Sequence, residues 1–473
     1  MHANAVFRNF NVKDGKKMEK TKSKNYTMDL TEGSILKKLL LFSLPLMASN
    51  VLQLFFNAAD IMVVGQFAGD NSLAAVGSTS SLIHLLTNVF MGLSVGVNVL
   101  VARFFAAKQD DELRKTVHTA IAVSLFCGIL MVLIGQVAAT PLLIAMGSPV
   151  EVIDLAVLYL RIYFLGMPAT ILYNFGAAIL RAVGDTKRPL YYLTFAGLVN
   201  LVLNCIFVIV FHMDVAGVAI ATVIAQTISM LLVLRCLGNE SGAIHLTRRY
   251  LGIDKRILIQ IVKIGLPAGI QSSLFSLSNV VIQSSINSFG ALAIAGNSSA
   301  QNLESFLNVT VNAFSQGGVA FVSQNVGAGK YKRINKVVIT LQACVFTVGI
   351  ILGNIMYLFG EQLLHLYSDS QAVIEFGMKR MMFACCFYFF YGMMDSMVAA
   401  IRGLGRSVVP MVVALLGVCG FRLAWIAVLH ANGLLQNIER IYVAYPLSWG
   451  MTFAAHTICF LIIRKGLKKK WGV

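Results

Sequence analysis

Four polar side chains recur at helical spacing inside an apolar segment near the N-terminus. Asn50, Gln53, Asn57 and Asp60 stand at positions i, i+3, i+7 and i+10 within LPLMASNVLQLFFNAADIMVVGQ. A helix places all four on one face. An ionisable group at membrane depth costs about 2.5 to 3.5 kcal/mol, so we expect the carboxylate of Asp60 to face the protein interior and to serve function. The competing interpretation is a structural hydrogen bond to a neighbouring helix.

Polar partners for such a carboxylate occur in the same half of the chain, in pairs one helical turn apart. These pairs are Tyr159 with Tyr163, Asn200 with Asn204, and Thr222 with Gln226. Amide and hydroxyl groups around a carboxylate suit either a proton or Na⁺. Taken singly, each of these residues is also a common helix-to-helix contact.

The elements that carry these residues are predicted to cross a membrane. The chain of 473 residues is 57% hydrophobic and 12% charged, with a mean hydropathy of +0.76, which excludes a soluble globular protein. A spanning helix needs about 20 mostly apolar residues. We therefore predict an all-α polytopic membrane protein with twelve transmembrane helices, at residues 36–65, 72–102, 116–140, 150–176, 188–211, 214–237, 257–287, 292–325, 335–359, 371–400, 407–430 and 441–464.

Charge alternates between the breaks that separate these runs. Basic breaks, such as the one with Arg181, Lys187 and Arg188, alternate with breaks that are nearly free of Lys and Arg, such as GQFAGDNS. The positive-inside rule then predicts that both termini are cytoplasmic. Basic loops that face anionic lipid account for the net charge of +17, so no nucleic-acid partner is expected.

The second half of the chain repeats the first. ILRAVGDTKRP (179–189) returns as AIRGLGRSVVP (400–410), which aligns Arg181 with Arg402. Each half holds six predicted helices, an even number, so the halves are expected to be parallel repeats about an axis along the membrane normal. The predicted organisation is an N-terminal cytoplasmic tail (1–34), an N-lobe (35–237), a cytoplasmic linker (238–256), a C-lobe (257–465) and a basic cytoplasmic tail (466–473).

The second half does not copy Asp60, which aligns with the apolar Val281 or Ile282. Its acidic groups within apolar runs are Glu304 and Asp395. Each has a transport interpretation and a packing interpretation. We expect these two residues, together with Gln53 and Asn57 on the face of Asp60, to line a substrate cavity.

Motifs of enzymes and of ATP-driven pumps are not convincing in this sequence. GLSVG (92–96) lies in an apolar run and lacks the strand-to-helix turn of a nucleophile elbow. GAGK (327–330) lacks the first Gly and the final Ser or Thr of a phosphate-binding loop. We therefore predict no enzymatic activity and no cofactor, and we expect an ion gradient to supply the energy for any pumping.

Taken together, the sequence resembles the multidrug and toxic compound extrusion (MATE) transporters. The motifs that carry the resemblance are LPLMASNVLQLFFNAADIMVVGQ, ILRAVGDTKRP, NLVLNCIFV, GVAIATVIAQ, QNLESF and QNVGAGKY. The resemblance implies two six-helix lobes in a V around a central cavity. It also implies a first-lobe cation site at Asp60, Asn200, Asn204 and Thr222, with Tyr159 nearby. Asn204 stands where many bacterial relatives have Asp.

The function predicted from the residues and the resemblance is multidrug efflux from a bacterial cell. A monomer in the inner membrane would export amphipathic, cationic compounds in exchange for H⁺ or Na⁺, through an electronegative cavity. The alternative is a flippase for lipid-linked saccharides, which would need several cationic side chains in its cavity to bind pyrophosphate. The Lys and Arg residues of this chain fall mostly at predicted cytoplasmic helix ends.

Overall fold

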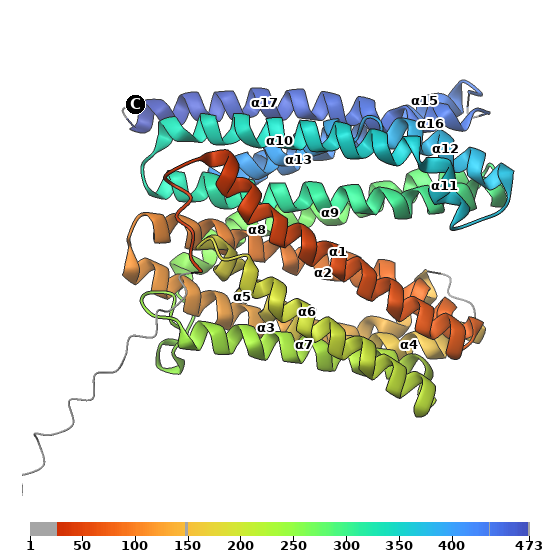
Figure 1. Ribbon diagram of the computed structural model, residues 1–473, viewed down its shortest axis with the longest axis horizontal. Helices are drawn as coiled ribbons and strands as arrows, with labels where there is room; N and C mark the ends of the chain where they lie inside the picture. The colour runs from red at the N-terminus through yellow and green to blue at the C-terminus, as the bar shows by residue number, and fades with distance from the viewer. Residues whose placement is uncertain (1–25, 147–149, 435, 472–473) are drawn as a thin grey trace, which may run out of the picture.

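A computed structural model of the chain describes residues 26–146, 150–434 and 436–471. Within these ranges the chain forms helices, joined by short turns (Figure 1). The first half contains α1 (Ile35–Phe67), α2 (Asp70–Ala106), α3 (Asp110–Ala145), α4 (Val150–Leu165), α5 (Met167–Ala182), α6 (Lys187–Asn204), the π-helical η1 (Cys205–Val210) and α7 (Asp214–Asn239).

A linker with the short 3₁₀ helix η2 (Arg248–Tyr250) leads to the second half. That half contains α8 (Lys255–Asn287), α9 (Ala291–Gly327), α10 (Tyr331–Leu358), α11 (Gly360–His365), α12 (Gln371–Ala384), α13 (Tyr388–Gly403), α14 (Val408–Ala414), the π-helical η3 (Leu415–Gly420), α15 (Phe421–Ala431), α16 (Ile438–Tyr442) and α17 (Ala444–Trp471).

The predicted membrane architecture is confirmed, with two local corrections. Among the described residues, nine helices are long and apolar enough to span a membrane, and two bent pairs raise the number to eleven. The more polar α9, with 37 residues, completes the twelve predicted spans. The predicted helices 150–176 and 371–400 are each two helices, bent by 46° between α4 and α5 and by 47° between α12 and α13. Pro168 follows the first of these breaks, where a proline is tolerated in the first turn of a helix.

The parallel repeat is visible in the helix boundaries. The bent pair α4–α5 and the bent pair α12–α13 begin 221 positions apart (150 and 371), and α2 and α9 keep the same offset (70 and 291). The ends of α2 and α9 also meet in space, because Gly327 lies against the backbone of Arg103. Equivalent helices therefore run in the same direction through both halves.

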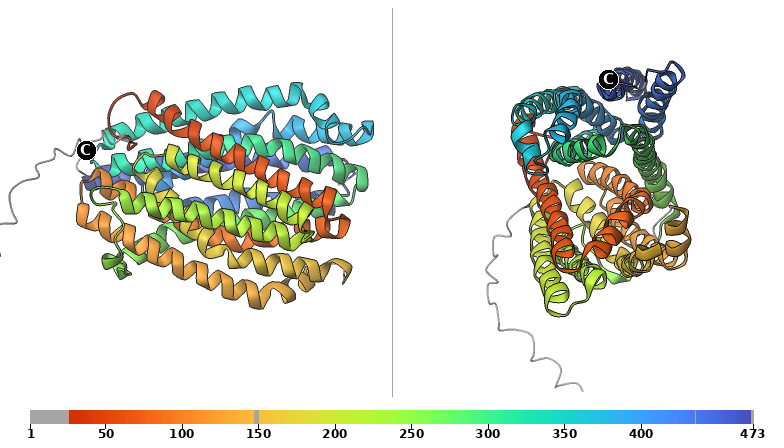
Figure 2. Two further views of the ribbon diagram at one scale, coloured as in Figure 1. Left: turned by 60° about the horizontal axis from the view of Figure 1, so that its bottom comes forward. Right: turned by 90° about the vertical axis from the view of Figure 1, so that its right-hand side faces the viewer.

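Two hydrophobic cores define two lobes, and α1 contributes to both. The N-lobe core is built mainly from α2 to α7 with Ile257, Ile261 and Ile264 of α8, and the C-lobe core mainly from α9 to α17 with Ile282 and Ile286 of α8. Leu39, Phe42 and Leu46, from the first half of α1, are buried in the C-lobe core, whereas Val63 and Val64, near its end, belong to the N-lobe core. In the end-on view of Figure 2, α1 (red) accordingly crosses from one lobe to the other.

The lobes approach most closely where α2 packs against α8. A Cβ atom on Gly92 would lie 2.2 Å from the backbone nitrogen of Gly269, and one on Gly265 would lie 2.5 Å from the Cα of Leu93. A Cβ atom is not tolerated at such distances, so the two backbones approach this closely only because these residues are glycines. Small residues have this role at many helix contacts in membranes.

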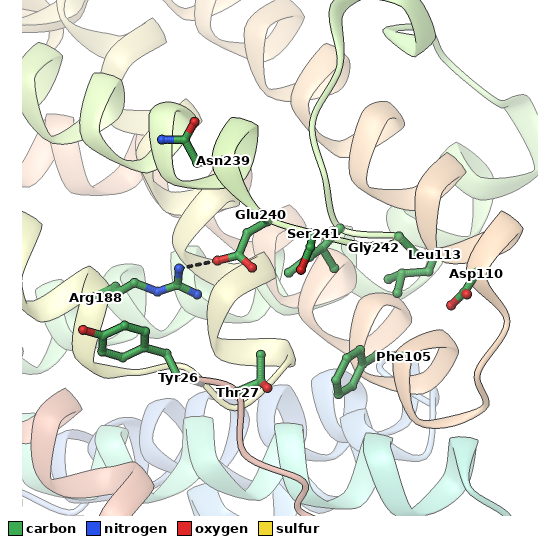
Figure 3. A pocket seen from close by; sticks show the side chains of 12 residues that line it. Tyr26, Thr27, Phe105, Asp110, Leu113, Arg188, Asn239, Glu240, Ser241 and Gly242 are labelled. Atoms are coloured by element: carbon green, nitrogen blue, oxygen red, sulfur yellow. Dashed lines mark hydrogen bonds and ion pairs between the residues drawn. The ribbon is translucent and has the colours of Figure 1, made fainter. Parts of the chain in front are cut away.

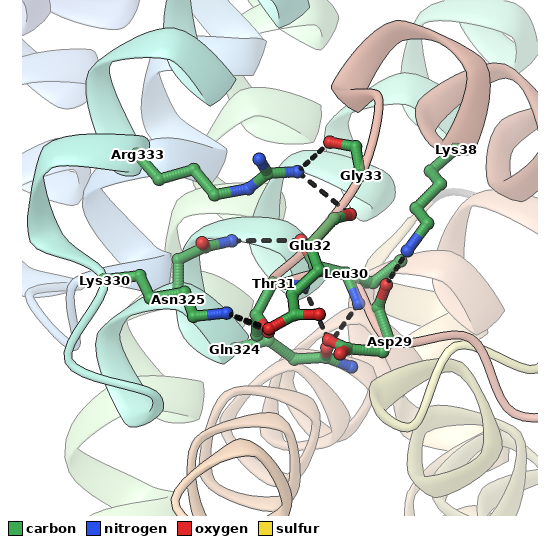
Figure 4. A network of polar contacts seen from close by, with 10 residues as sticks. All are labelled: Asp29, Leu30, Thr31, Glu32, Gly33, Lys38, Gln324, Asn325, Lys330 and Arg333. Atoms are coloured by element: carbon green, nitrogen blue, oxygen red, sulfur yellow. Dashed lines mark hydrogen bonds and ion pairs between the residues drawn. The ribbon is translucent and has the colours of Figure 1, made fainter.

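Residues 26–34, named here the N-terminal strap, lie across both lobes at the end of the molecule that carries the basic loops (Figure 4). Met28 donates its backbone N–H to the carbonyl of Val183 in the N-lobe, at 3.2 Å. Leu30 is fully buried, and its carbonyl accepts a hydrogen bond from Asn325 of the C-lobe at 3.3 Å. Within the predicted cytoplasmic tail, these residues are thus an integral part of the fold.

Charged contacts hold both ends of the strap. Glu32 pairs with Lys330 at 2.8 Å, and Arg333 donates to the carbonyls of Glu32 and Gly33. At the other end, the ring of Tyr26 lies 5.0 Å from the guanidinium of Arg188. Figure 3 shows this region, where Arg188 also pairs with Glu240 beside a cavity of about 480 Å³.

Candidate functional site: a carboxylate cluster in the N-lobe and an arginine-lined cavity in the C-lobe

The structure joins Asp60 to the two asparagines that the sequence proposed as its partners. Asn200 donates from Nδ2 to both oxygens of the Asp60 carboxylate, at 3.0 and 3.2 Å. Asn204 donates to Oδ1 of the same carboxylate. Both asparagines are buried on α6, one turn apart, so their side chains point the same way towards α1. The π-helical segment η1 begins directly after Asn204, and such segments are frequent at functional sites.

The charge of Asp60 has no cationic partner. Among the described residues, no Lys, Arg or His forms an ion pair with Asp60, and its hydrogen bonds come from neutral amides alone. The carbonyl oxygens of Asn200 and Asn204 are buried without any hydrogen-bond partner. Carboxylate and amide oxygens are good ligands for a hard cation, and a protonated carboxyl group can donate to an amide oxygen. The donor set therefore fits either Na⁺ or H⁺.

The remaining members of the predicted cation site, Tyr159 and Thr222, make no hydrogen bond to the Asp60 carboxylate within the described residues. Tyr159 and Tyr163 stack with their ring centroids 6.0 Å apart, and both interact electrostatically with Asp60. Thr222 is half-buried on α7 and makes no hydrogen bond to Asp60 in the described part of the chain. The cluster at the carboxylate thus consists of Asp60, Asn200 and Asn204, with the two tyrosines beside it.

A separate cavity of about 860 Å³ lies mainly within the C-lobe. Its lining is rich in aromatic and apolar side chains and includes Glu304, as expected from the sequence. The lining comes from α2, α8, α9, α12, α13, η3, α15 and α17, with Met146 directly after α3. Its residues include Leu82, His84, Asn88, Phe275, Asn279, Gln283, Glu304, Arg380, Tyr388, Tyr391, Arg422, Tyr445 and Trp449.

Two arginines that the sequence did not single out line this cavity. Arg380 donates to Glu304 at 2.6 Å and to Asn297 at 2.8 Å. Arg422 is buried as well and donates to Ser448 at 2.9 Å. Three of the lining residues are Asp, Glu, Lys or Arg, and they supply two guanidinium groups and one carboxylate. The expectation of an electronegative cavity is therefore wrong for this part of the protein.

The error has a physical reason. Positive charge was expected at cytoplasmic helix ends, but Arg380 and Arg422 lie inside predicted spans, within EFGMKRMMFACC and VCGFRLAWIAV. An arginine flanked by apolar residues on both sides is a functional signal at membrane depth. That signal was present in the sequence for Arg422, which lies between Phe421 and Leu423, whereas Arg380 follows Lys379. The convergence of the two arginines on one cavity depends on how α12 and α15 pack.

Three residues predicted for the substrate cavity do not line it. Gln53 and Asn57 are exposed on α1, and the carboxylate of Asp395 accepts a hydrogen bond from Ser315 of α9. Asn50, on the same stripe as Gln53, donates to the carbonyl of Val309 at 3.2 Å and so links α1 to α9. A transport role for Gln53, Asn57 and Asp395 stays a prediction.

The two helical lobes, the parallel repeat and the buried polar sites define a polytopic membrane transporter. The MatE family model matches residues 45–206 and 267–426, so the chain belongs to the MatE family of multidrug and toxic compound extrusion transporters. It is 27% identical to the "Probable multidrug resistance protein YoeA" of Bacillus subtilis (strain 168), over 92% of this chain and 95% of that protein.

A second relative and a solved structure are also similar to this chain. The chain is 22% identical to a protein of Shewanella oneidensis named "FAD transporter", over 89% of this chain and 93% of that protein. Its fold is similar to a solved structure titled "Outward-facing conformation of a multidrug resistance MATE family transporter of the MOP superfamily", with a TM-score of 0.87, 20% identity, and coverage of 93% of this chain and 98% of that chain. None of these three names supports the alternative of a saccharide-lipid flippase.

Proposed function

We propose that this protein is a secondary active exporter of amphipathic small molecules, driven by H⁺ or Na⁺ that binds at Asp60. Membership of the MatE family and the name of the Bacillus subtilis relative support multidrug export. The single observation that supports the ion site is the Asp60 carboxylate, which two buried amides contact and which forms no ion pair with a cationic side chain of the described residues. An uncompensated charge inside a membrane protein is costly, and an exchangeable cation relieves that cost.

The proposed cycle uses the two lobes as the moving parts. The lobes meet at α2 and α8 and at the strap, and the large cavity lies in the half of the molecule away from the basic loops. With the basic loops in the cytoplasm, this arrangement opens towards the outside of the cell. A cation that binds Asp60 removes the charge and changes the amide contacts between α1 and α6. It can shift the lobes only by its different affinity for the two states.

The proposal places one copy of the chain in the bacterial inner membrane, with both termini in the cytoplasm. The alternating charge of the loops and the nine to eleven apolar spans support this placement. A single copy already contains both lobes, the carboxylate cluster and the cavity, so the cycle needs no second subunit.

The decisive experiment compares Asp60→Asn with the wild type in liposomes. Asparagine keeps the size and hydrogen-bonding capacity of the side chain but cannot bind or release a proton or bind Na⁺ by charge. At matched protein level, and with H⁺ and Na⁺ gradients imposed separately, we expect Asp60→Asn to insert normally and to lose gradient-driven dye export. The gradient that drives the wild type identifies the coupling ion.

A matched control and a conservative variant sharpen this test. Asp154→Asn removes an exposed carboxylate from α4 of the same lobe and should export normally. Asp60→Glu should retain partial export with a displaced pH optimum, because the carboxylate is kept but moved. Full export by Asp60→Asn would show that the carboxylate is structural and that coupling occurs elsewhere.

A further inference from the structure

The repeat offset places a different chemistry at equivalent positions of the two lobes. Adding 221 positions, the offset of α4 and α12, carries Tyr159 of the N-lobe cluster onto Arg380. The same offset carries Leu201, the neighbour of Asn200, onto Arg422. Neither arginine therefore has a charged counterpart in the N-lobe, just as Asp60 has none in the C-lobe.

One of the two guanidinium groups already has an anionic partner. Arg380 pairs with Glu304 at 2.6 Å, and the side chain of Asn297 accepts a second hydrogen bond from it. Both charged groups are largely buried, with 5% of the Arg380 and 14% of the Glu304 side chain exposed. A close, hydrogen-bonded pair of this kind is electrically balanced, so it leaves little net charge in the cavity.

Arg422 has no such partner. Arg422 is only 4% exposed, and within the described residues its side chain donates one hydrogen bond, to the neutral hydroxyl of Ser448. Its Nη2 atom is buried without a hydrogen-bond partner. Among the described residues, no carboxylate forms an ion pair with Arg422. A buried donor on a charged group that lacks an acceptor is costly, and the cavity that Arg422 lines is where an acceptor can enter.

Aromatic rings hold the guanidinium of Arg422 in place without neutralising it. Its central carbon lies 4.3 Å from the ring centroid of Tyr445 and 5.7 Å from that of Trp449. The guanidinium of Arg380 lies 5.2 Å from the same Tyr445 ring. Two cations therefore share one aromatic ring, and Glu304 pairs with Arg380 alone of the two. Cation–π contacts orient a guanidinium, but they do not supply the missing acceptor.

We propose that the C-lobe cavity binds the anionic group of an amphipathic substrate, a carboxylate, sulfonate or phosphate, with Arg422 as its partner. This inference rests on the proposed export function and names the substrate class of its cavity. The planar guanidinium offers two N–H groups to such oxygens, which is the geometry that arginine uses for planar anions. The cavity volume of about 860 Å³ suits a drug-sized molecule.

The rest of the substrate would lie against the aromatic part of the lining. Tyr388, Tyr391 and Trp449 form a connected cluster, with centroids 5.0 to 5.8 Å apart, along the wall that also carries Arg422. A substrate with an apolar or aromatic body and an anionic end would match both surfaces, because its body would pack against these rings and its anionic end would bind Arg422. An anion there does not compete for Asp60, so ion and substrate are coupled only through the arrangement of the lobes.

The test uses two dyes with the same xanthene ring system and opposite charge. Fluorescein is anionic and rhodamine 123 is cationic, and each is titrated by fluorescence anisotropy against the purified full-length protein in detergent. The wild type should bind fluorescein more tightly than rhodamine 123. Arg422→Gln should weaken fluorescein binding about tenfold or more, the loss of one charge-assisted contact, and leave rhodamine 123 binding unchanged or stronger.

Controls separate the loss of the site from the loss of the fold. Arg161→Gln removes an exposed arginine of α4 outside the cavity and should bind both dyes as the wild type does. Arg422→Lys keeps the charge but not the planar donors, and should bind fluorescein better than Arg422→Gln does. Two results would overturn the proposal: an equal loss of affinity for both dyes in Arg422→Gln, or tighter binding of rhodamine 123 than of fluorescein by the wild type. The comparison of the two dyes on the wild type does not require any variant to fold.

The anionic group can come from a soluble molecule or from a lipid headgroup, and competition distinguishes these sources. Displacement of fluorescein by phosphatidylglycerol but not by phosphatidylcholine would assign the site to an anionic headgroup, whereas displacement by soluble aromatic sulfonates alone would assign it to a soluble substrate. Binding in detergent needs no ion gradient. Charge-selective binding without export in liposomes would therefore contradict the proposed export and leave the anion site standing.

Discussion

The backbone N–H of Leu30 donates to Oε1 of Gln324 at 3.0 Å, although the two residues are 294 positions apart. The Nε2 atom of the same Gln324 donates to the carbonyl of Ala182 at 2.7 Å. One buried amide on α9 thus contacts both the N-lobe and the strap, and Figure 4 shows its contact with the strap. The lobes cannot separate at this end unless the hydrogen bond from Gln324 to Ala182 breaks, so Gln324 stabilises the closed arrangement of the basic end.

Replacing Gln324 should loosen that closure. Gln324→Ala leaves the Leu30 N–H and the Ala182 carbonyl without partners, and each unsatisfied buried group costs about 1 to 3 kcal/mol. We expect a lower midpoint of thermal unfolding in detergent and faster hydrogen exchange in residues 26–34. Gln316→Ala is the matched control, because this side chain on the same helix donates to Asn312 one turn earlier. Unchanged exchange in the strap would contradict the role given to Gln324.

The contact between α2 and α8 should be intolerant of a single methyl group. In Gly92→Ala the new Cβ would lie 2.2 Å from the backbone of Gly269, so the two helices must move apart. Overpacking of this kind costs about 1 to 3 kcal/mol. Gly77→Ala, on the same α2, meets no atom within 4 Å and should be neutral or slightly stabilising. Thermal unfolding of the two variants, measured side by side, tests the contact, and equal midpoints would refute it.

Neutralising the two C-lobe carboxylates should have different effects. Glu304→Gln leaves Arg380 buried without its anion, and breaking a buried ion pair costs about 3 to 5 kcal/mol. We therefore expect a marked loss of thermal stability. Replacement of Asp395, whose carboxylate accepts a hydrogen bond from Ser315, by Asn should change substrate preference more than ion dependence, because we propose that the ion binds at Asp60. Liposome export across a panel of dyes tests this, and an equal loss for all dyes at normal protein level would move the coupling to the C-lobe.

The topology predicts which side of the membrane reaches the end of α7. Asn239 is exposed beside the cavity shown in Figure 3 and lies on the same side as the basic loops. A cysteine introduced there in Asn239→Cys should resist a membrane-impermeant maleimide in intact cells and react after the membrane is opened. A reporter fused after Val473 should likewise behave as cytoplasmic. Labelling of Asn239→Cys in intact cells would reverse the proposed orientation.

Features that depend on local pattern could be predicted from the sequence. A run of apolar residues long enough to cross a bilayer must form a helix, because its backbone polar groups have no water to bind. The motif around Arg181 recurs around Arg402, which indicated that the two halves fold alike. Because each half has six predicted helices, an even number, the halves were expected to be parallel. The spacing of Asn200 and Asn204, one turn apart on an apolar helix, identified the partners of Asp60, which the structure brings within hydrogen-bonding distance.

The charge of the cavity and the position of the strap were decided only by the tertiary structure. Arg380 and Arg422 are 42 positions apart, and nothing local brings both against the ring of Tyr445; the packing of α12 and α15 on α17 does so. Residues 26–34 read as a polar tail, yet Leu30 is buried between lobes that lie far away in sequence. Helical periodicity specifies which side chains share a face, but which faces meet depends on contacts that the whole chain makes at once.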